Sequence, residues 1–201
     1  MSNLKETILN PILKGNPITV LILGICSSLA VTVELKGAIV MALSVTIVTG
    51  LSSFVCSLIR KTIPNRVRII VQLVVVALMV IVVDQFLKAY AYSIDKQLSV
   101  YIGLIITNCI VMGRIEAYAL GNKPIPSLLD GLANGVGYGI ILVIVAFFRE
   151  LFGSGTLFGV PVLSAIGYTN NGLVILPPFA LILLGCIIWI HRSIQKDLQE
   201  K

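Results

Sequence analysis

The chain has 201 residues, of which 57% are hydrophobic and 12% are charged, and its mean hydropathy is +1.02. So much apolar surface cannot be buried in the single core of a soluble domain of this size, which excludes a soluble globular protein and predicts an integral membrane protein. The net charge is +6, and the basic residues lie between or beside the apolar segments. We therefore expect a lipid bilayer around the chain and no nucleic acid as partner.

The first half of the chain contains an interfacial segment and three candidate membrane spans. Residues 1–17 carry apolar side chains at helical spacing and two prolines, a pattern typical of a short helix on the membrane surface. The uncharged segment 18–33 has 16 residues, whereas a straight helix needs about 20 to cross a bilayer. Full-length spans are predicted over 37–59 and 69–87, joined by a short basic loop.

The second half has the same order of segments. The uncharged segment 98–113 again has 16 residues, and two longer spans are predicted over 131–148 and 172–190. The pattern therefore predicts an all-α integral membrane protein with six transmembrane helices.

Three features concern the ends of the later helices. Ser127 to Asp130 predict a capping box at the start of the fifth span. Pro177 and Pro178 predict a kink in the sixth span. Residues 153–171 are rich in Gly, Pro, Ser and Asn, and we expect a long external loop there.

The basic residues are distributed unequally over the two sides of six spans. Eleven lysines and arginines lie in the termini and in the second and fourth loops, against four on the opposite side. Because cytoplasmic loops carry the excess of Lys and Arg, both termini are predicted to be cytoplasmic. The four residues of the opposite side are Lys36, Lys88, Lys96 and Arg149.

The chain reads as a single membrane domain over 1–201 that contains two repeats, about 18–93 and 97–193. Cys26 aligns with Cys109 at an offset of 83 residues. Because each repeat has three spans, the second repeat enters the membrane from the side opposite to the first. The repeats are therefore expected to be inverted. The first and fourth helices are then short and broken at the membrane midplane, where irregular backbone is tolerated only if protein or a cavity surrounds it.

Cys26 and Cys109 lie in the middle of the two short segments. Thiolates are soft ligands for iron–sulfur clusters, zinc or copper(I). A cluster normally takes four cysteines, so a second subunit would have to supply two of them. Buried thiols also serve as small packing residues, so a metal site and a packing role are both open for this pair, whereas Cys56 and Cys186 are assigned to packing. The neighbouring polar side chains that could donate hydrogen bonds toward sulfur are Ser27, Ser28, Thr107 and Asn108.

Two further patterns are assigned to structural roles. Gly131, Gly135 and Gly139 superficially resemble a nucleotide-binding loop, but the run is apolar and no strand precedes it, so we expect close helix packing. Charged side chains near the span ends are expected to reach the membrane interface. These residues are Glu34, Asp84, Glu116 and Glu150, with His191 at the cytoplasmic edge.

Three segments, 23–32, 103–114 and 147–155, resemble a family of membrane subunits. This family comprises the D and E subunits of the sodium-translocating NADH:quinone oxidoreductase and the membrane subunits of the Rnf ferredoxin:NAD oxidoreductase. The run from Ile106 to Arg114 is specific to this superfamily, and the similarity extends over essentially the whole chain. Segments 57–60, 63–65, 67–72 and 82–85 are more similar to the D branch of the sodium pump than to Rnf.

The resemblance implies a [2Fe-2S] cluster, or iron, held between the D and E subunits by two cysteines from each, and the two positions match Cys26 and Cys109. It implies the E subunit as pseudo-symmetric partner, with the A, B, C and F subunits in the same complex of the bacterial inner membrane. Electrons from NADH and FAD would cross the membrane through this centre toward FMN and quinone, coupled to sodium export. No flavin is expected on this chain, because Leu157 stands where the sibling subunits carry the acceptor threonine.

Three alternatives remain open from the sequence. The chain could be a membrane subunit of an Rnf-type ferredoxin:NAD oxidoreductase. An inverted repeat with broken helices is also typical of a secondary transporter without a redox centre. A purely structural scaffold for other subunits is the third.

Overall fold

The computed structural model describes residues 15–64, 66–90, 103–157, 160–161 and 172–194. Within these ranges four helices are long and apolar enough to cross a membrane, which confirms a helical membrane protein. The expected surface helix within residues 1–17 falls almost wholly outside the described residues. The four long helices are α3 (Leu35–Ile59), α4 (Arg68–Tyr90), α7 (Pro124–Gly153) and α8 (Pro177–Ile194).

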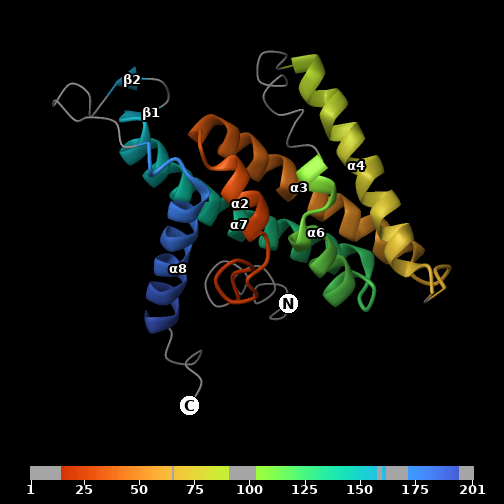
Figure 1. Ribbon diagram of the computed structural model, residues 1–201. Helices are drawn as coiled ribbons and strands as arrows, with labels where there is room; N and C mark the ends of the chain where they lie inside the picture. Colours follow the sequence, from red (N-terminus) through yellow and green to blue (C-terminus); the bar gives the residue numbers. More distant parts are fainter. Residues whose placement is uncertain (1–14, 65, 91–102, 158–159, 162–171, 195–201) are drawn as a thin grey trace.

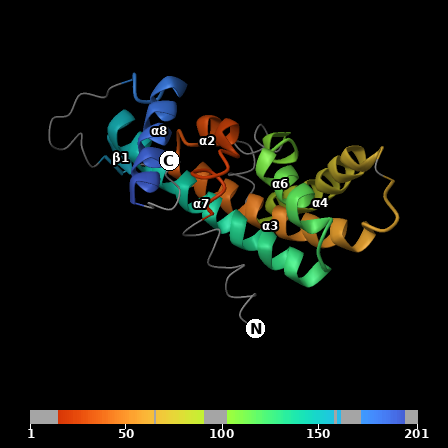
Figure 2. The ribbon, with the colours of Figure 1, turned by 90° about the horizontal axis from the view of Figure 1, so that it is seen from below.

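Helices α3 and α7 form the centre of the molecule and lie side by side along their lengths (Figures 1 and 2). The three glycines on α7 make this close approach possible. A Cβ at Gly135 would lie 2.6 Å from the Cα of Thr46, and one at Gly139 would lie 3.0 Å from the Cβ of Ala42. Residue numbers rise along α7 while those of its α3 neighbours fall, so the two helices are antiparallel. The prediction that these glycines serve helix packing is confirmed.

Each of the two short segments contains a short helix that follows irregular or broken backbone, and neither is a full-length span. Residues 15–24 form turns and bends before α2 (Ile25–Val31), and Ile22 and Gly24 both have left-handed backbone, with φ of 56° and 81°. Residues 103–106 are helical, and the chain then breaks before α6 (Cys109–Arg114). Each cysteine therefore lies in the first turn of a helix that starts at a break.

Helix α6 continues directly into a π-helix, η1 (Ile115–Ala119). The N–H of Leu120 donates to the carbonyl of Ile115 at 3.2 Å, which is the five-residue spacing of a π turn. A π turn is rare and is often found at functional sites. Arg114, the last residue of α6, forms an ion pair with α7, where its Nε donates to Asp130 Oδ2 at 2.9 Å.

Two predicted helix ends are wrong, and proline explains both. Helix α7 begins at Pro124, so the segment 127–130 lies inside the helix and no capping box forms; Ser127 Oγ donates instead to the carbonyl of Lys123 at 2.9 Å. Helix α8 begins at Pro177 rather than kinking there. Proline lacks an N–H and has a helical φ, which suits the first turn of a helix better than its interior.

The predicted loop over 153–171 is described only in part. Gly153 is the last residue of α7, and a two-residue antiparallel pair follows, β1 (Thr156–Leu157) with β2 (Val160–Pro161). Residues 158–159 and 162–171 lie outside the described residues.

Glu150 was expected to reach the interface from a span end, and Arg149 was counted among the basic residues outside the spans; both expectations are wrong. Arg149 is 1% exposed and Glu150 is 6% exposed. The Arg149 guanidinium donates to the carbonyl of Leu29, in the last turn of α2, and to the carbonyl of Ile175. Glu150 Oε2 accepts the N–H of Leu35, the first residue of α3, at 2.6 Å. Unpaired backbone groups at the end of α2 and the start of α3 thus supply part of the hydrogen bonding of the two buried charges.

Candidate functional site

The structure brings Cys26 and Cys109 together. The Cys109 thiol makes a side-chain hydrogen bond and an electrostatic interaction with Cys26, although 83 residues separate them in the chain. Both short helices lie on the same side of the α3–α7 pair (Figure 2). Cys26 is exposed and Cys109 is partly buried, so the dithiol opens onto the surface of the chain.

Gly24 shapes the first of the two cysteine-bearing turns. Its N–H donates to Cys109 Sγ at 2.8 Å, so the backbone before α2 contacts the sulfur of α6 directly. With φ at +81°, Gly24 has a left-handed conformation that L side chains rarely adopt. A Cβ there would also lie 2.8 Å from Cε2 of Tyr138 and 3.0 Å from Cδ1 of Ile110. Only glycine can bring this N–H to the sulfur.

A buried polar layer lies behind the two cysteine-bearing turns. Ser27 Oγ and the hydroxyl of Tyr138 are 2.6 Å apart, and Asn108 Nδ2 donates to Ser27 Oγ at 3.3 Å. Asn108 Oδ1 also accepts the N–H of Ile110 at 3.2 Å and so caps α6. Ser27, Asn108 and Tyr138 are all 0% exposed. Their hydrogen bonds join α2, α6 and α7.

Of the four polar neighbours expected from the sequence, Ser27 and Asn108 belong to this layer and the other two do not. Thr107 Oγ1 is bonded to the carbonyl of Gly103 at 3.1 Å, one turn back in its own segment. Ser28 Oγ is bonded to the carbonyl of Ile25 at 2.8 Å. Both hydroxyls are thus used within their own helices.

Tyr138 was not anticipated from the sequence. It lies on α7 between Gly137 and Gly139, in the run that the glycine pattern assigns to packing. One signal was available, because a tyrosine hydroxyl inside an apolar helix needs a hydrogen-bond partner. The partner could not be identified without knowing that the two short segments meet beside α7.

The remaining two cysteines lie on long helices. Cys56 is 0% exposed in the apolar core, on α3. Cys186 is exposed on α8. Within the described residues, no group of three or more His, Cys, Asp or Glu could hold a metal. The Cys26–Cys109 pair offers two soft sulfur donors, and any metal bound there would need its other ligands from outside the described residues.

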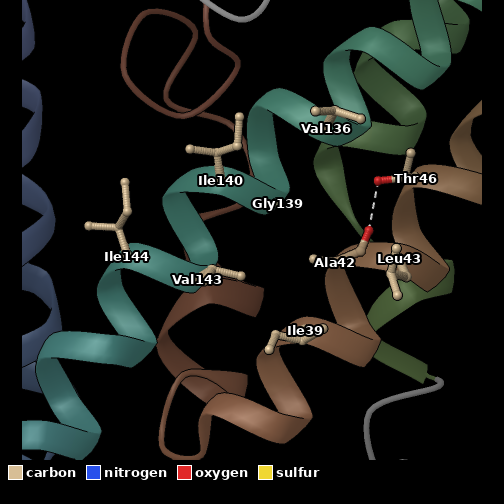
Figure 3. A pocket seen from close by; sticks show the side chains of 9 residues that line it. All are labelled: Ile39, Ala42, Leu43, Thr46, Val136, Gly139, Ile140, Val143 and Ile144. Atoms are coloured by element: carbon tan, nitrogen blue, oxygen red, sulfur yellow. Dashed lines mark hydrogen bonds between the residues drawn. The ribbon is translucent and has the colours of Figure 1, made fainter.

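An apolar groove of about 440 Å³ lies between α3 and α7 (Figure 3). Thr46 contributes a hydroxyl to its lining, and that hydroxyl donates to the carbonyl of Ala42 in its own helix at 2.7 Å. Val136 and Ile140 lie two residues to either side of Tyr138, about 200° around the helix. The groove therefore opens on the opposite side of α7 from the polar layer. Its lining residues are Ile39, Ala42, Leu43, Thr46, Val136, Gly139, Ile140, Val143 and Ile144.

Comparison with known proteins places the chain in a family. Residues 4–188 match the family described as Rnf-Nqr subunit, membrane protein. The D subunit of the Na(+)-translocating NADH-quinone reductase of Serratia proteamaculans (strain 568) is 56% identical over 202 residues, which cover 98% of this chain and 97% of the relative. The D subunit of the same enzyme from Haemophilus influenzae (strain PittGG) is 57% identical over 201 residues, covering 98% and 97%. That of Psychromonas ingrahamii is 57% identical over 203 residues, covering 99% and 97%.

These matches extend over nearly the whole length of each chain, including both cysteine-bearing segments. The level of identity is far above what a shared membrane composition alone would give. The chain therefore belongs to the Rnf-Nqr family of membrane-protein subunits.

Proposed function

We propose that the chain is the D-type membrane subunit of a sodium-translocating NADH:quinone reductase and that Cys26 and Cys109 hold half of an iron–sulfur centre. The pseudo-symmetric E-type subunit would supply the other two cysteines, and the A, B, C and F subunits complete the complex. One observation carries the proposal: two thiols from distant segments meet at the surface of the chain and are open on one side.

The residues present fit a [2Fe-2S] cluster. Two neighbouring thiols give the soft donor set that iron–sulfur clusters use. The Gly24 N–H already donates to Cys109 Sγ, and hydrogen bonds to sulfur are among the factors that set a cluster's potential. When bound, the cluster supplies one-electron transfer between redox groups on the two sides of the membrane. The part of this chain is to hold two ligands, orient them and exclude water from their buried side.

The fold supports a matching membrane topology. We infer six crossings in two inverted repeats, with the interrupted segments before α2 and α6 near the midplane of the bacterial inner membrane. Arg149 is buried in the structure, so it is not counted as a loop residue. Eleven lysines and arginines then lie on the side of the termini and three on the opposite side. Both termini are accordingly placed in the cytoplasm.

The alternatives have less support. A transporter needs polar groups converging on a substrate cavity, whereas the groove between α3 and α7 is lined almost entirely by hydrocarbon. An Rnf-type role is also consistent with membership of the Rnf-Nqr family. The three relatives compared above, however, are all named as sodium-translocating NADH-quinone reductase subunits. A scaffold role leaves the meeting of the two thiols without a purpose.

Replacing each cysteine by alanine tests the proposal in the purified complex. We expect Cys26→Ala and Cys109→Ala each to remove the iron of one cluster and its low-temperature paramagnetic signal, because a half-liganded cluster is not held. NADH-driven quinone reduction should be lost in both, while part of the complex still assembles.

Cys56→Ala and Cys186→Ala are the matched controls and should keep iron, signal and turnover. Unchanged iron content in the Cys26 and Cys109 variants would refute the redox role. Unchanged quinone reduction would instead favour a scaffold.

A further inference from the structure

Tyr138 occupies the junction of the two cysteine-bearing turns. Its hydroxyl makes hydrogen bonds with Ser27 of the first turn and Asn108 of the second. Its ring lies where a Cβ of Gly24 would be, beside Ile110. A single side chain of α7 thus contacts both short helices, directly behind the thiols.

The short helices cannot fix their own positions. Helix α2 has 7 residues and α6 has 6, whereas isolated helices shorter than about 12–15 residues are marginal. Tyr138, in contrast, is anchored on the long helix α7, whose glycines pack it against α3. The relative placement of Cys26 and Cys109 therefore depends on contacts with a third element.

We propose that Tyr138 is a positioning residue that sets the relative placement of Cys26 and Cys109 through Ser27 and Asn108, and thereby the retention and reduction potential of the centre they hold. This inference rests on the proposed function. A tyrosine hydroxyl has one donor and two acceptor sites, enough to serve both partners at once. A phenylalanine would fill the same volume but leave both partners without that oxygen.

The ring and the hydroxyl make separate contributions. The ring fills space beneath Gly24, as any aromatic residue could, and this role is packing alone. The hydroxyl is the part that hydrogen-bonds to Ser27 and Asn108, which also contact each other at 3.3 Å, and it ties this pair to α7. Its removal therefore separates positioning from packing. Outer-shell hydrogen bonds of this kind typically change metal affinity or activity by about 10–100-fold when lost.

The variant Tyr138→Phe in the purified complex tests the proposal. We expect normal subunit content, a shifted midpoint potential of the Cys26-dependent paramagnetic signal, and loss of iron to a chelator about tenfold faster than in the parent complex. The matched control is Tyr118→Phe, because Tyr118 is a partly buried tyrosine on η1 that stacks under the Arg114 guanidinium, 5.8 Å from it. That variant should leave the potential and the rate of iron loss unchanged.

Ser27→Ala removes the same hydrogen bond from its other end, so it should shift the potential in the same direction even if Tyr138→Phe assembles poorly. In a Ser27→Ala background the Tyr138 hydroxyl has already lost one partner, so positioning predicts that adding Tyr138→Phe shifts the potential and the rate of iron loss by less than it does alone. Additive effects, or lower thermal stability with an unchanged potential, would show that Tyr138 only fills space.

A metal-free measurement separates failure of this inference from failure of the proposed function. In the iron-depleted complex, diamide takes two electrons and two protons from Cys26 and Cys109 and leaves a disulfide. The rate of that reaction reports how the thiols are placed, and we expect it to fall about tenfold in Tyr138→Phe. An unchanged rate and potential overturn the inference. A slowed rate in a complex that never holds Cys26-dependent iron supports the positioning role and refutes the redox function.

Discussion

At the scale of single residues, Gly24 has both a backbone role and a hydrogen-bonding role. Its left-handed backbone turns the chain into α2, and its N–H reaches Cys109 Sγ at 2.8 Å. The absence of a side chain lets Tyr138 lie against it. The first cysteine-bearing turn, the second one and the helix behind them are therefore in contact at a single Cα.

Gly24→Ala is expected to lower the stability of the site. A left-handed L-residue costs about 1–2 kcal/mol, and the added Cβ would lie 2.8 Å from the Tyr138 ring. We expect a lower thermal midpoint and reduced iron content in the purified complex. Gly37→Ala is the control, since a Cβ at Gly37 meets nothing within 4 Å and alanine favours a helix by up to about 1 kcal/mol. Equal behaviour of the two variants would contradict this role of Gly24.

At the scale of elements, the pairing of α3 with α7 is the support on which the site is built. Gly131 and Gly135 allow backbone-to-backbone contact, with a Cβ at Gly131 only 2.8 Å from the carbonyl oxygen of Thr49. Small residues at such crossings are typical of helices packed inside membranes. Any separation of the pair would move Tyr138 away from the cysteine-bearing turns.

Gly135→Ala should separate α3 from α7 and lower the stability of the complex. The new Cβ would lie 2.6 Å from the Cα of Thr46, where no flexible side chain can move aside. We expect overpacking to cost about 1–3 kcal/mol, measured as a lower thermal midpoint in detergent. Gly185→Ala on α8 is the control, because a Cβ at Gly185 has open space around it. A Gly135→Ala complex as stable as this control would exclude the close crossing.

Hydropathy was sufficient to predict the helical class and the two segments that are too short for a full span. Helix starts at Pro124 and Pro177 were missed, because span prediction ends a helix where polarity rises, whereas proline decides where its backbone begins. Arg149 was counted outside the spans because a charge normally marks the end of a span. Its partners are the Thr32 hydroxyl and backbone carbonyls of two other segments, and such contacts cannot be derived without the tertiary fold.

At the scale of the whole molecule, the long helices fall into two classes. In the apolar 18-residue stretch of each helix, 56% of α3 and 61% of α7 is buried, against 22% of α4 and 11% of α8. Figure 1 shows α4 and α8 on opposite flanks of the central pair. Most of their apolar surface is thus available to lipid or to other subunits.

The proposed topology is testable with fusions to the full chain. We expect green fluorescent protein to fluoresce at either terminus, because both termini are placed in the cytoplasm by the loop charges. Alkaline phosphatase should be inactive at the same two positions, and active when joined after Lys96, between the two repeats. Active phosphatase at the C-terminus would mean an odd number of crossings or the opposite orientation.

The outward opening of the dithiol has a consequence for biogenesis. On the proposed function, half of the ligands belong to each of two chains, so neither chain retains iron before the other has docked. A newly inserted chain would carry Cys26 exposed beside Cys109, as the isolated chain does here, and could be trapped by oxidation to an internal disulfide. Docking with the partner must therefore precede or accompany cluster insertion, and an unpaired chain would carry no cluster.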